Sequence, residues 1–120
     1  IVSLHVALTP DTINTVDDNF LSKMKNDAFL INTSRGDLVD NNALKNALLK
    51  GEIAGAGLDV FTPEPLEKDN PLLDIKLKDK LILTPHIAGI THLTVERIYK
   101  NILENTQNII YGRELKNKVN

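Results

Sequence analysis

Four short apolar runs, each ended by turn-forming residues, constrain the fold of this chain most strongly. The runs are nearly continuous, whereas a strand with one face in water would alternate apolar and polar residues. Runs of this kind are typical of buried parallel strands. We expect strands over residues 1–8, 28–32, 53–60 and 81–84. The glycines of the third run predict room for a helix to pack closely against that strand.

Apolar residues at helical spacing lie between and after these runs. Residues 17–25 are expected to form a short helix. Asp40 is suited to cap a second helix, which Gly51 ends and in which one face carries Leu44, Leu48 and Leu49. The longest helix is expected from 91 or 94 to 111 and is ended by Gly112, with an apolar stripe of Val95, Ile98, Ile102 and Ile109.

Strands that alternate with helices through short connections predict an α/β fold. Right-handed crossovers would give a mainly parallel sheet that is covered on both faces. The chain has 120 residues and is 42% hydrophobic, which suits one domain with one core. Residues 61–79 are rich in proline and acidic side chains, so we expect a surface loop with at most a turn of helix there.

Composition excludes several classes of function. The formal net charge is -2 and no basic stripe is present, which argues against nucleic-acid and membrane-surface partners. No apolar run approaches the roughly 18 residues of a membrane span. The sequence has no cysteine, which excludes disulfides, thiolate metal ligands and cysteine nucleophiles, and the cytoplasm is the expected location. No metal is predicted, because His-Glu-x-x-His and similar ligand spacings are missing, and so is a Gly-x-Ser-x-Gly elbow.

In a parallel sheet, ligands bind just beyond the carboxyl ends of the strands. Arg35 is one of only three arginines against eleven lysines, and it alone follows a buried strand. Its guanidinium would bind a carboxylate through two parallel hydrogen bonds, and Gly36 after it would allow a positive φ. The structural alternative is an arginine that satisfies loop carbonyls.

His86 and Glu64 follow two other strands of the predicted sheet. Histidine is the side chain best suited to exchange a proton near neutral pH, and a neighbouring carboxylate fixes its tautomer and favours its protonated form. Pro63 and Pro65 flank Glu64 and would hold its loop in a fixed shape. The alternatives are a structural histidine and a solvated loop charge.

Three further polar side chains are interpreted more conservatively. Asp59 ends a buried strand, where an unpaired charge is costly, so we expect it to be paired with backbone amides or with a cofactor amide group. His5 is interpreted as a hydrogen-bonded histidine near the sheet edge. His92, at the start of the long helix, is interpreted as solvated.

At these positions the sequence resembles the NAD-dependent D-2-hydroxyacid dehydrogenases, which include glycerate, hydroxypyruvate and phosphoglycerate dehydrogenases. The resemblance is carried, in order along nearly the whole chain, by Val2-Ser3-Leu4-His5-Val6, Leu30-Ile31-Asn32-Thr33-Ser34-Arg35-Gly36, Gly57-Leu58-Asp59-Val60-Phe61 with Glu64-Pro65, and Thr84-Pro85-His86-Ile87 with Gly89. It implies a Rossmann-type fold, of which this chain would be the second half of a doubly wound, mainly parallel sheet with a long C-terminal helix.

The resemblance also implies a function and a set of site residues. A hydride would pass between NAD(H) and a small 2-oxo or 2-hydroxy acid. Arg35 would bind the substrate, His86 would protonate its oxygen, and Glu64 would be the partner of His86. The nicotinamide end of the cofactor would be held by Thr33, Ser34, Arg35, Asp59, His86 and Gly89. Glu64 argues against the related formate dehydrogenases, in which a glutamine takes this place.

The sequence departs from the family pattern at two small positions and in one large respect. Ala7 stands where proline is common and Ala88 where glycine is common. More importantly, the sequence lacks the Gly-x-Gly-x-x-Gly phosphate loop and the substrate domain. We therefore expect a fragment: residues 1–90 as the C-terminal half of the NAD-binding domain, and 91–120 as a helix and tail returning towards the missing substrate domain. Alone it should be nearly inactive.

Several alternatives stay open at the level of sequence. A non-catalytic, NAD-sensing regulator, like the corepressors that share this fold, would keep the same residues. A small self-contained domain that only binds partners is a third possibility. The residues that choose the 2-hydroxy acid and that distinguish NAD from NADP would lie outside these 120 positions. The intact protein is expected to be a homodimer.

Overall fold

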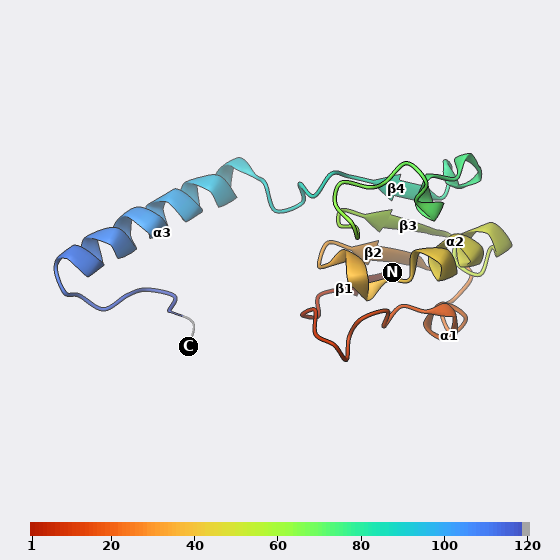
Figure 1. Cartoon of the computed structure of the whole chain (residues 1–120), viewed down its shortest axis with the longest axis horizontal. Helices are drawn as coiled ribbons and strands as arrows, with labels where there is room; N and C mark the ends of the chain where they lie inside the picture. Colours follow the sequence, from red (N-terminus) through yellow and green to blue (C-terminus); the bar gives the residue numbers. More distant parts are fainter. Residues whose placement is uncertain (119–120) are drawn as a thin grey trace. The chain divides into compact units, whose positions relative to one another are not determined.

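The computed structural model describes residues 1–118 and divides the chain into two compact units, Ile1–Ile87 and Ala88–Asn120 (Figure 1). Positions 119 and 120, at the end of the predicted polar tail, lie outside the described residues. The first unit holds β1 (Val2–Leu4), α1 (Asp18–Leu21), β2 (Phe29–Asn32), α2 (Asn41–Lys50), β3 (Gly55–Leu58) and β4 (Leu81–Leu83). Short 3-10 turns cover Gly36–Leu38, Pro71–Leu73 and Ile75–Leu77, and the second unit holds α3 (His92–Ile110).

The strands form one parallel sheet in the order β1-β2-β3-β4. Asn32 lies opposite Leu4 on one side and Leu58 on the other, and Leu58 lies opposite Leu83. The four carboxyl ends are therefore level with one another. This arrangement confirms the predicted parallel α/β sheet.

β1 is shorter than the predicted strand over residues 1–8. The Ser34 hydroxyl donates to the Val6 carbonyl at 2.8 Å, and the Thr12 hydroxyl donates to the Ala7 carbonyl at 2.9 Å. Because side chains take these carbonyls, residues 5–9 leave the strand ladder, and a turn follows over residues 10–14. The third strand is likewise limited to Gly55–Leu58.

α1 covers only four residues of the predicted 17–25 helix. The Asp17 carboxylate caps it by accepting from the Phe20 amide at 2.7 Å. Beyond Leu21, the amides of Lys23 and Met24 bond to carbonyls three residues back, at 3.2 and 3.1 Å. Bonds of this spacing tighten the chain out of the α-helical form.

α2 matches the predicted second helix at both ends. The Asp40 carboxylate accepts from the amides of Asn42 and Ala43, and Gly51 ends the helix with a φ of +74°. Its buried face consists of Ala43, Leu44, Ala47 and Leu48. Leu49 is 41% exposed, so its predicted place on this face is wrong, because one residue along a helix turns it away from the core.

α1 and α2 pack against each other over one face of the sheet. Successive right-handed crossovers in one direction place both helices on the same side. The core on this side includes Leu21, Leu30, Leu44 and Leu58. On the other face of this unit Phe29 is 48% and Ile82 is 71% exposed, so the expectation of a sheet covered on both faces is wrong for residues 1–87.

The glycines of β3 face this open side. A Cβ added at Gly57 would lie 3.2 Å from the Ile31 side chain, and one added at Gly55 would lie 3.1 Å from the Phe29 ring. Gly57 therefore makes room for a side chain of β2, and Gly55 makes room both for the Phe29 ring and for the Lys80 carbonyl oxygen, which would lie 2.8 Å from the added Cβ. Within residues 1–87 no helix packs on this side, so the expected closely packed helix is not found in this unit.

α3 begins at a cap formed by Thr91, whose hydroxyl accepts from the Thr94 amide at 3.1 Å. Gly112, with a φ of +62°, follows its end. Among the described residues, none of α3 is buried, and the side chains of the predicted apolar stripe are exposed. No helix among the described residues is long and apolar enough to cross a membrane.

Two neighbouring leucines of α2 test this packing. Leu48 is fully buried and Leu49 is 41% exposed. Leu48→Ala is expected to lower the free energy of unfolding by about 2–5 kcal/mol, because it removes buried contacts and leaves a cavity. Leu49→Ala should change it by less than about 0.5 kcal/mol. Urea unfolding of the purified chain measures both, and equal losses would contradict the assignment of the core face.

Candidate active site

The polar side chains predicted at the strand ends gather at the level carboxyl edge of the sheet. Arg35 follows β2, Glu64 lies in the loop after β3, and His86 follows β4. All three line one hollow of about 200 Å³. The structure thus brings together three residues from separate segments of the chain.

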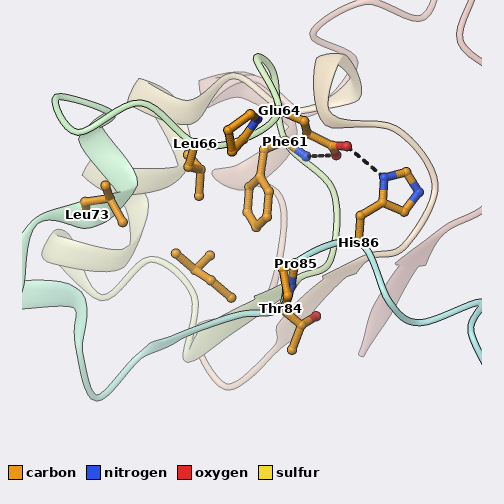
Figure 2. Close-up of a pocket in the computed structure, with 9 residues that line it drawn as sticks. Phe61, Glu64, Leu66, Leu73, Thr84, Pro85 and His86 are labelled. Carbon is orange, nitrogen blue, oxygen red and sulfur yellow. Dashed lines mark hydrogen bonds and ion pairs between the residues drawn. The ribbon is translucent and has the colours of Figure 1, made fainter.

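Glu64 and His86 are in direct contact. His86 Nδ1 lies 2.8 Å from Glu64 Oε2, and the other carboxylate oxygen accepts from the Phe61 amide at 2.9 Å (Figure 2). The hydrogen bond from His86 and then that from the Phe61 amide hold the pKa of Glu64 below its ordinary value. Glu64 is therefore an ionised acceptor that fixes the orientation of the imidazole.

The backbone of His86 is held in an uncommon conformation. Its φ is +53°, in the left-handed region that is costly for a residue with a side chain. Asp59 Oδ1 accepts from the Thr84 hydroxyl at 2.5 Å and from the Ile87 amide at 2.9 Å, so it holds the chain on both sides of His86. A further bond runs from the His86 amide to the Thr84 carbonyl at 3.0 Å.

Asp59 is only 3% exposed, and its hydrogen-bond partners show how this buried carboxylate is paired. Backbone amide and hydroxyl donors compensate the cost of burying this carboxylate. The predicted pairing with backbone amides is therefore present in the structure. A role for Asp59 towards a cofactor stays a prediction.

Arg35 is exposed and in extended conformation, and its Nη1 donates to the Ser34 carbonyl at 2.6 Å. Gly36 after it does not take the expected positive φ. The reason for glycine here is close approach, because a Cβ would lie only 2.1 Å from the Phe61 carbonyl carbon. The turn that carries Arg35 thus rests directly on the backbone of the segment that carries Glu64.

A second hollow, of about 540 Å³, lies beside the Glu64–His86 pair and is mostly apolar. Figure 2 shows Phe61, Leu66 and Leu73 on one side and the His86 ring turned away from them. The ring nitrogen that does not contact Glu64 therefore points away from the apolar walls. The smaller hollow shared with Arg35 is the better candidate for a polar substrate.

The other predicted cofactor residues occupy different surroundings. Thr33 is exposed, whereas Ser34 is half-buried and its hydroxyl is bonded to the Val6 carbonyl. Gly89 belongs to the second unit. Roles for all three towards the nicotinamide end stay predictions.

The remaining histidines lie outside this site. His5 Nε2 bonds to the Ser3 hydroxyl at 2.9 Å, next to the end of β1. His92 is exposed and lies 3.5 Å from Glu96. Across residues 1–118, no three His, Asp or Glu side chains are grouped so that they could hold a metal ion.

Sequence reasoning missed three contributors to the geometry. They are the buried Asn32, the Thr84 hydroxyl and the Phe61 amide. Asn32 carried a usable signal, since a polar residue at the end of an apolar run must find hydrogen bonds when buried. The Phe61 amide carried no such signal, because a backbone amide is the same for every residue type except proline.

Comparison with known proteins decides the family. Residues 1–88 match the family described as D-isomer specific 2-hydroxyacid dehydrogenase, NAD binding domain. The chain belongs to this family. The family resemblance drawn from the sequence is thereby confirmed.

Relatives and a solved structure of the D-2-hydroxyacid dehydrogenases align with most of the chain. A glyoxylate reductase of Korarchaeum cryptofilum is 47% identical over 87% of the chain and 30% of its own length. A glycerate dehydrogenase of Methylorubrum extorquens is 42% identical over 94% of the chain and 36% of its own length. The NAD complex of a family member from Lactobacillus delbrueckii ssp. bulgaricus is 35% identical with a TM-score of 0.85, over 99% of the chain and 39% of that structure. The chain thus spans about one third of the proteins it matches.

The contact between Gly36 and Phe61 yields one test of this site. Gly36→Ala is expected to force the Arg35 turn away from Phe61, because the added Cβ would overlap a backbone that cannot yield as a flexible side chain does. We expect a loss of stability of about 1–3 kcal/mol and a shifted Phe61 amide signal in NMR spectra. Gly89→Ala, where nothing lies within 4 Å, is the control for stability. Equal stability of both variants would contradict the close contact.

The pKa of Glu64 yields a second test. His86→Ala is expected to raise that pKa towards its ordinary value, because the His86 hydrogen bond is the largest cause of the lowering. Since the pKa is lowered in the folded state, the contribution of Glu64 to stability is present above its unfolded pKa. It is lost as the pH falls through the folded value. Carbon-13 NMR titration of the carboxyl group in both proteins measures the shift, and an unchanged midpoint would refute this assignment of cause.

Proposed function

We propose that this chain is the C-terminal part of an oxidoreductase that transfers a hydride between NAD(H) and a small 2-oxo or D-2-hydroxy acid. The observation that carries the proposal is the hollow shared by Arg35, Glu64 and His86, in which a cation adjoins a carboxylate–imidazole pair. Such a site suits a substrate with a carboxylate next to a carbonyl. The names of the relatives, a glyoxylate reductase and a glycerate dehydrogenase, agree with this substrate class.

The proton steps follow from the geometry of the pair. The ionised Glu64 accepts from Nδ1, which leaves His86 Nε2 as the nitrogen that faces away from Glu64. In the direction of reduction, Nε2 gives a proton to the carbonyl oxygen as the hydride reaches the carbonyl carbon. In the reverse direction it takes that proton from the hydroxyl group. Arg35 binds the substrate carboxylate and orients the carbonyl towards His86.

The strand ends also fit the nicotinamide end of NAD(H). A carboxamide needs both an acceptor and a donor, and Asp59 and Thr33 supply a carboxylate and a hydroxyl at neighbouring strand ends. When bound, the cofactor supplies or accepts the hydride. The Gly-x-Gly-x-x-Gly loop that binds pyrophosphate in such sites is not among these 120 residues, so we propose that the chain alone turns over no substrate.

Kinetic assays test this function. The product of the complete reading frame that contains this chain is expected to reduce hydroxypyruvate with NADH or NADPH. His86→Asn should lower kcat about 10²–10⁴-fold, because the proton donor is lost. Arg35→Leu should raise the KM for the oxo acid about tenfold or more, because it removes a charge-assisted bond to the carboxylate. The isolated chain should show no turnover.

Two exposed residues outside the hollow, Arg97 and His92, provide matched controls. Arg97→Leu and His92→Asn should leave the turnover with oxo acid unchanged. Turnover by the isolated chain would overturn its proposed inactivity, and full activity without His86 would overturn the proposed proton transfer. A complete protein that binds NADH but reduces no 2-oxo acid would instead be a regulator of the same fold.

The proposal includes finer expectations for the intact protein. Its substrate is glycerate, hydroxypyruvate or 3-phosphoglycerate. It binds neither nucleic acid nor membranes. It is located in the cytoplasm and forms a homodimer. Comparison of kcat/KM among the three acids and sedimentation of the complete protein test the substrate and the dimer.

A further inference from the structure

Asn32, the last residue of β2, is 1% exposed although it is polar. A buried amide is costly unless its oxygen and its nitrogen both find partners. Among the described residues, this side chain makes two hydrogen bonds, and both lie in the turn that leads to Arg35. The Asn32 side chain therefore stabilises the shape of that turn.

Two hydrogen bonds define this shape. Asn32 Oδ1 accepts from the Ser34 amide at 3.0 Å, and Nδ2 donates to the Arg35 carbonyl at 2.8 Å. The pair closes the three-residue turn from both directions. It also fixes which atom of the amide is oxygen and which is nitrogen, because one partner is a donor and the other an acceptor. The Asn32 carbonyl in turn accepts from the Asp59 amide at 2.9 Å, which ties the turn to β3.

The position of the Arg35 guanidinium depends on this arrangement. Among residues 1–118, the guanidinium hydrogen bond goes to the carbonyl of Ser34, the residue whose amide Asn32 holds. The Ser34 hydroxyl is anchored to Val6. An exposed, flexible side chain is thus attached to a backbone that a buried amide fixes at two points.

We propose that Asn32 is a positioning residue, which sets where the Arg35 guanidinium meets the carboxylate of the 2-oxo acid. This inference rests on the proposed function of Arg35. Asn32 itself is buried beneath the turn and acts only through Arg35. Its loss should weaken binding of the oxo acid more than it slows the chemical step at His86.

Two substitutions separate the bonds. Asn32→Asp keeps an acceptor for the Ser34 amide but loses the donor to the Arg35 carbonyl, and it places two oxygens against each other. Asn32→Leu has a similar volume and loses both bonds. We expect the KM for the oxo acid to rise about tenfold with Asp and about a hundredfold with Leu, with kcat within about threefold of the original.

Leu30→Ala is the matched control, because Leu30 is fully buried on the same strand and the same face as Asn32. It should lower stability without raising the KM for the oxo acid. Unchanged KM values in both Asn32 variants of the complete enzyme would overturn the proposal. So would an equal rise in KM with Leu30→Ala, since general destabilisation would then be enough.

A second measurement keeps this inference separate from the proposed function. In the complete protein, Asn32→Leu should speed hydrogen exchange of the Ser34 amide and mobilise the Arg35 Nε–H group in nitrogen-15 relaxation, while Asn32→Asp keeps the Ser34 amide protected. If the unsubstituted protein reduces no 2-oxo acid, the proposed function is wrong. The exchange and relaxation signals then still test whether Asn32 positions Arg35. Unchanged Ser34 exchange and Arg35 mobility in Asn32→Leu would refute it.

Discussion

The parallel register of the sheet is the constraint on which the rest of the structure depends. β2 lies between β1 and β3 with Asn32 level with Leu4 and Leu58, and β4 extends the same row through Leu83. Strands of one direction and one level necessarily deliver their following residues to the same edge. Arg35 and His86 are 51 positions apart in the sequence and still line one hollow, because each follows a strand of this row.

Short contacts along that edge fix the positions of the Arg35 turn, Glu64 and His86 relative to one another. Gly36 lets the Arg35 turn touch the Phe61 backbone, the Phe61 amide holds one oxygen of Glu64, and the other oxygen holds His86. Backbone groups supply two of these links, and backbone moves less easily than side chains. The relation between the guanidinium turn and the imidazole is therefore determined by the fold and not by flexible side chains alone.

The parts of this architecture that the sequence predicted are those with local causes. Continuous apolar runs predicted the strands, the Asp40 and Gly51 caps predicted α2, and the prolines around Glu64 predicted a shaped loop. The errors have distant causes. The end of β1 depends on a hydroxyl from Ser34, 28 residues away, and the open sheet face follows from two crossovers in the same direction. The sequence suggested that glycine is needed at position 36 for a positive φ, whereas it is needed there for close contact with the Phe61 backbone. A sequence does not show which backbone segment lies opposite a residue.

Two carboxylates near His86 have different roles because their surroundings differ. Asp59 is buried and bonded to neutral donors on either side of His86, so it shapes the backbone there. Glu64 is exposed and bonded to the imidazole itself. The negative charge of Asp59 acts to raise the pKa of Glu64, yet the pKa is lowered, because the bonds from His86 and Phe61 outweigh that repulsion. Glu64 therefore stays ionised beside a second negative charge, and in the proposed function this ionised carboxylate holds Nδ1 while the opposite nitrogen exchanges protons with the substrate.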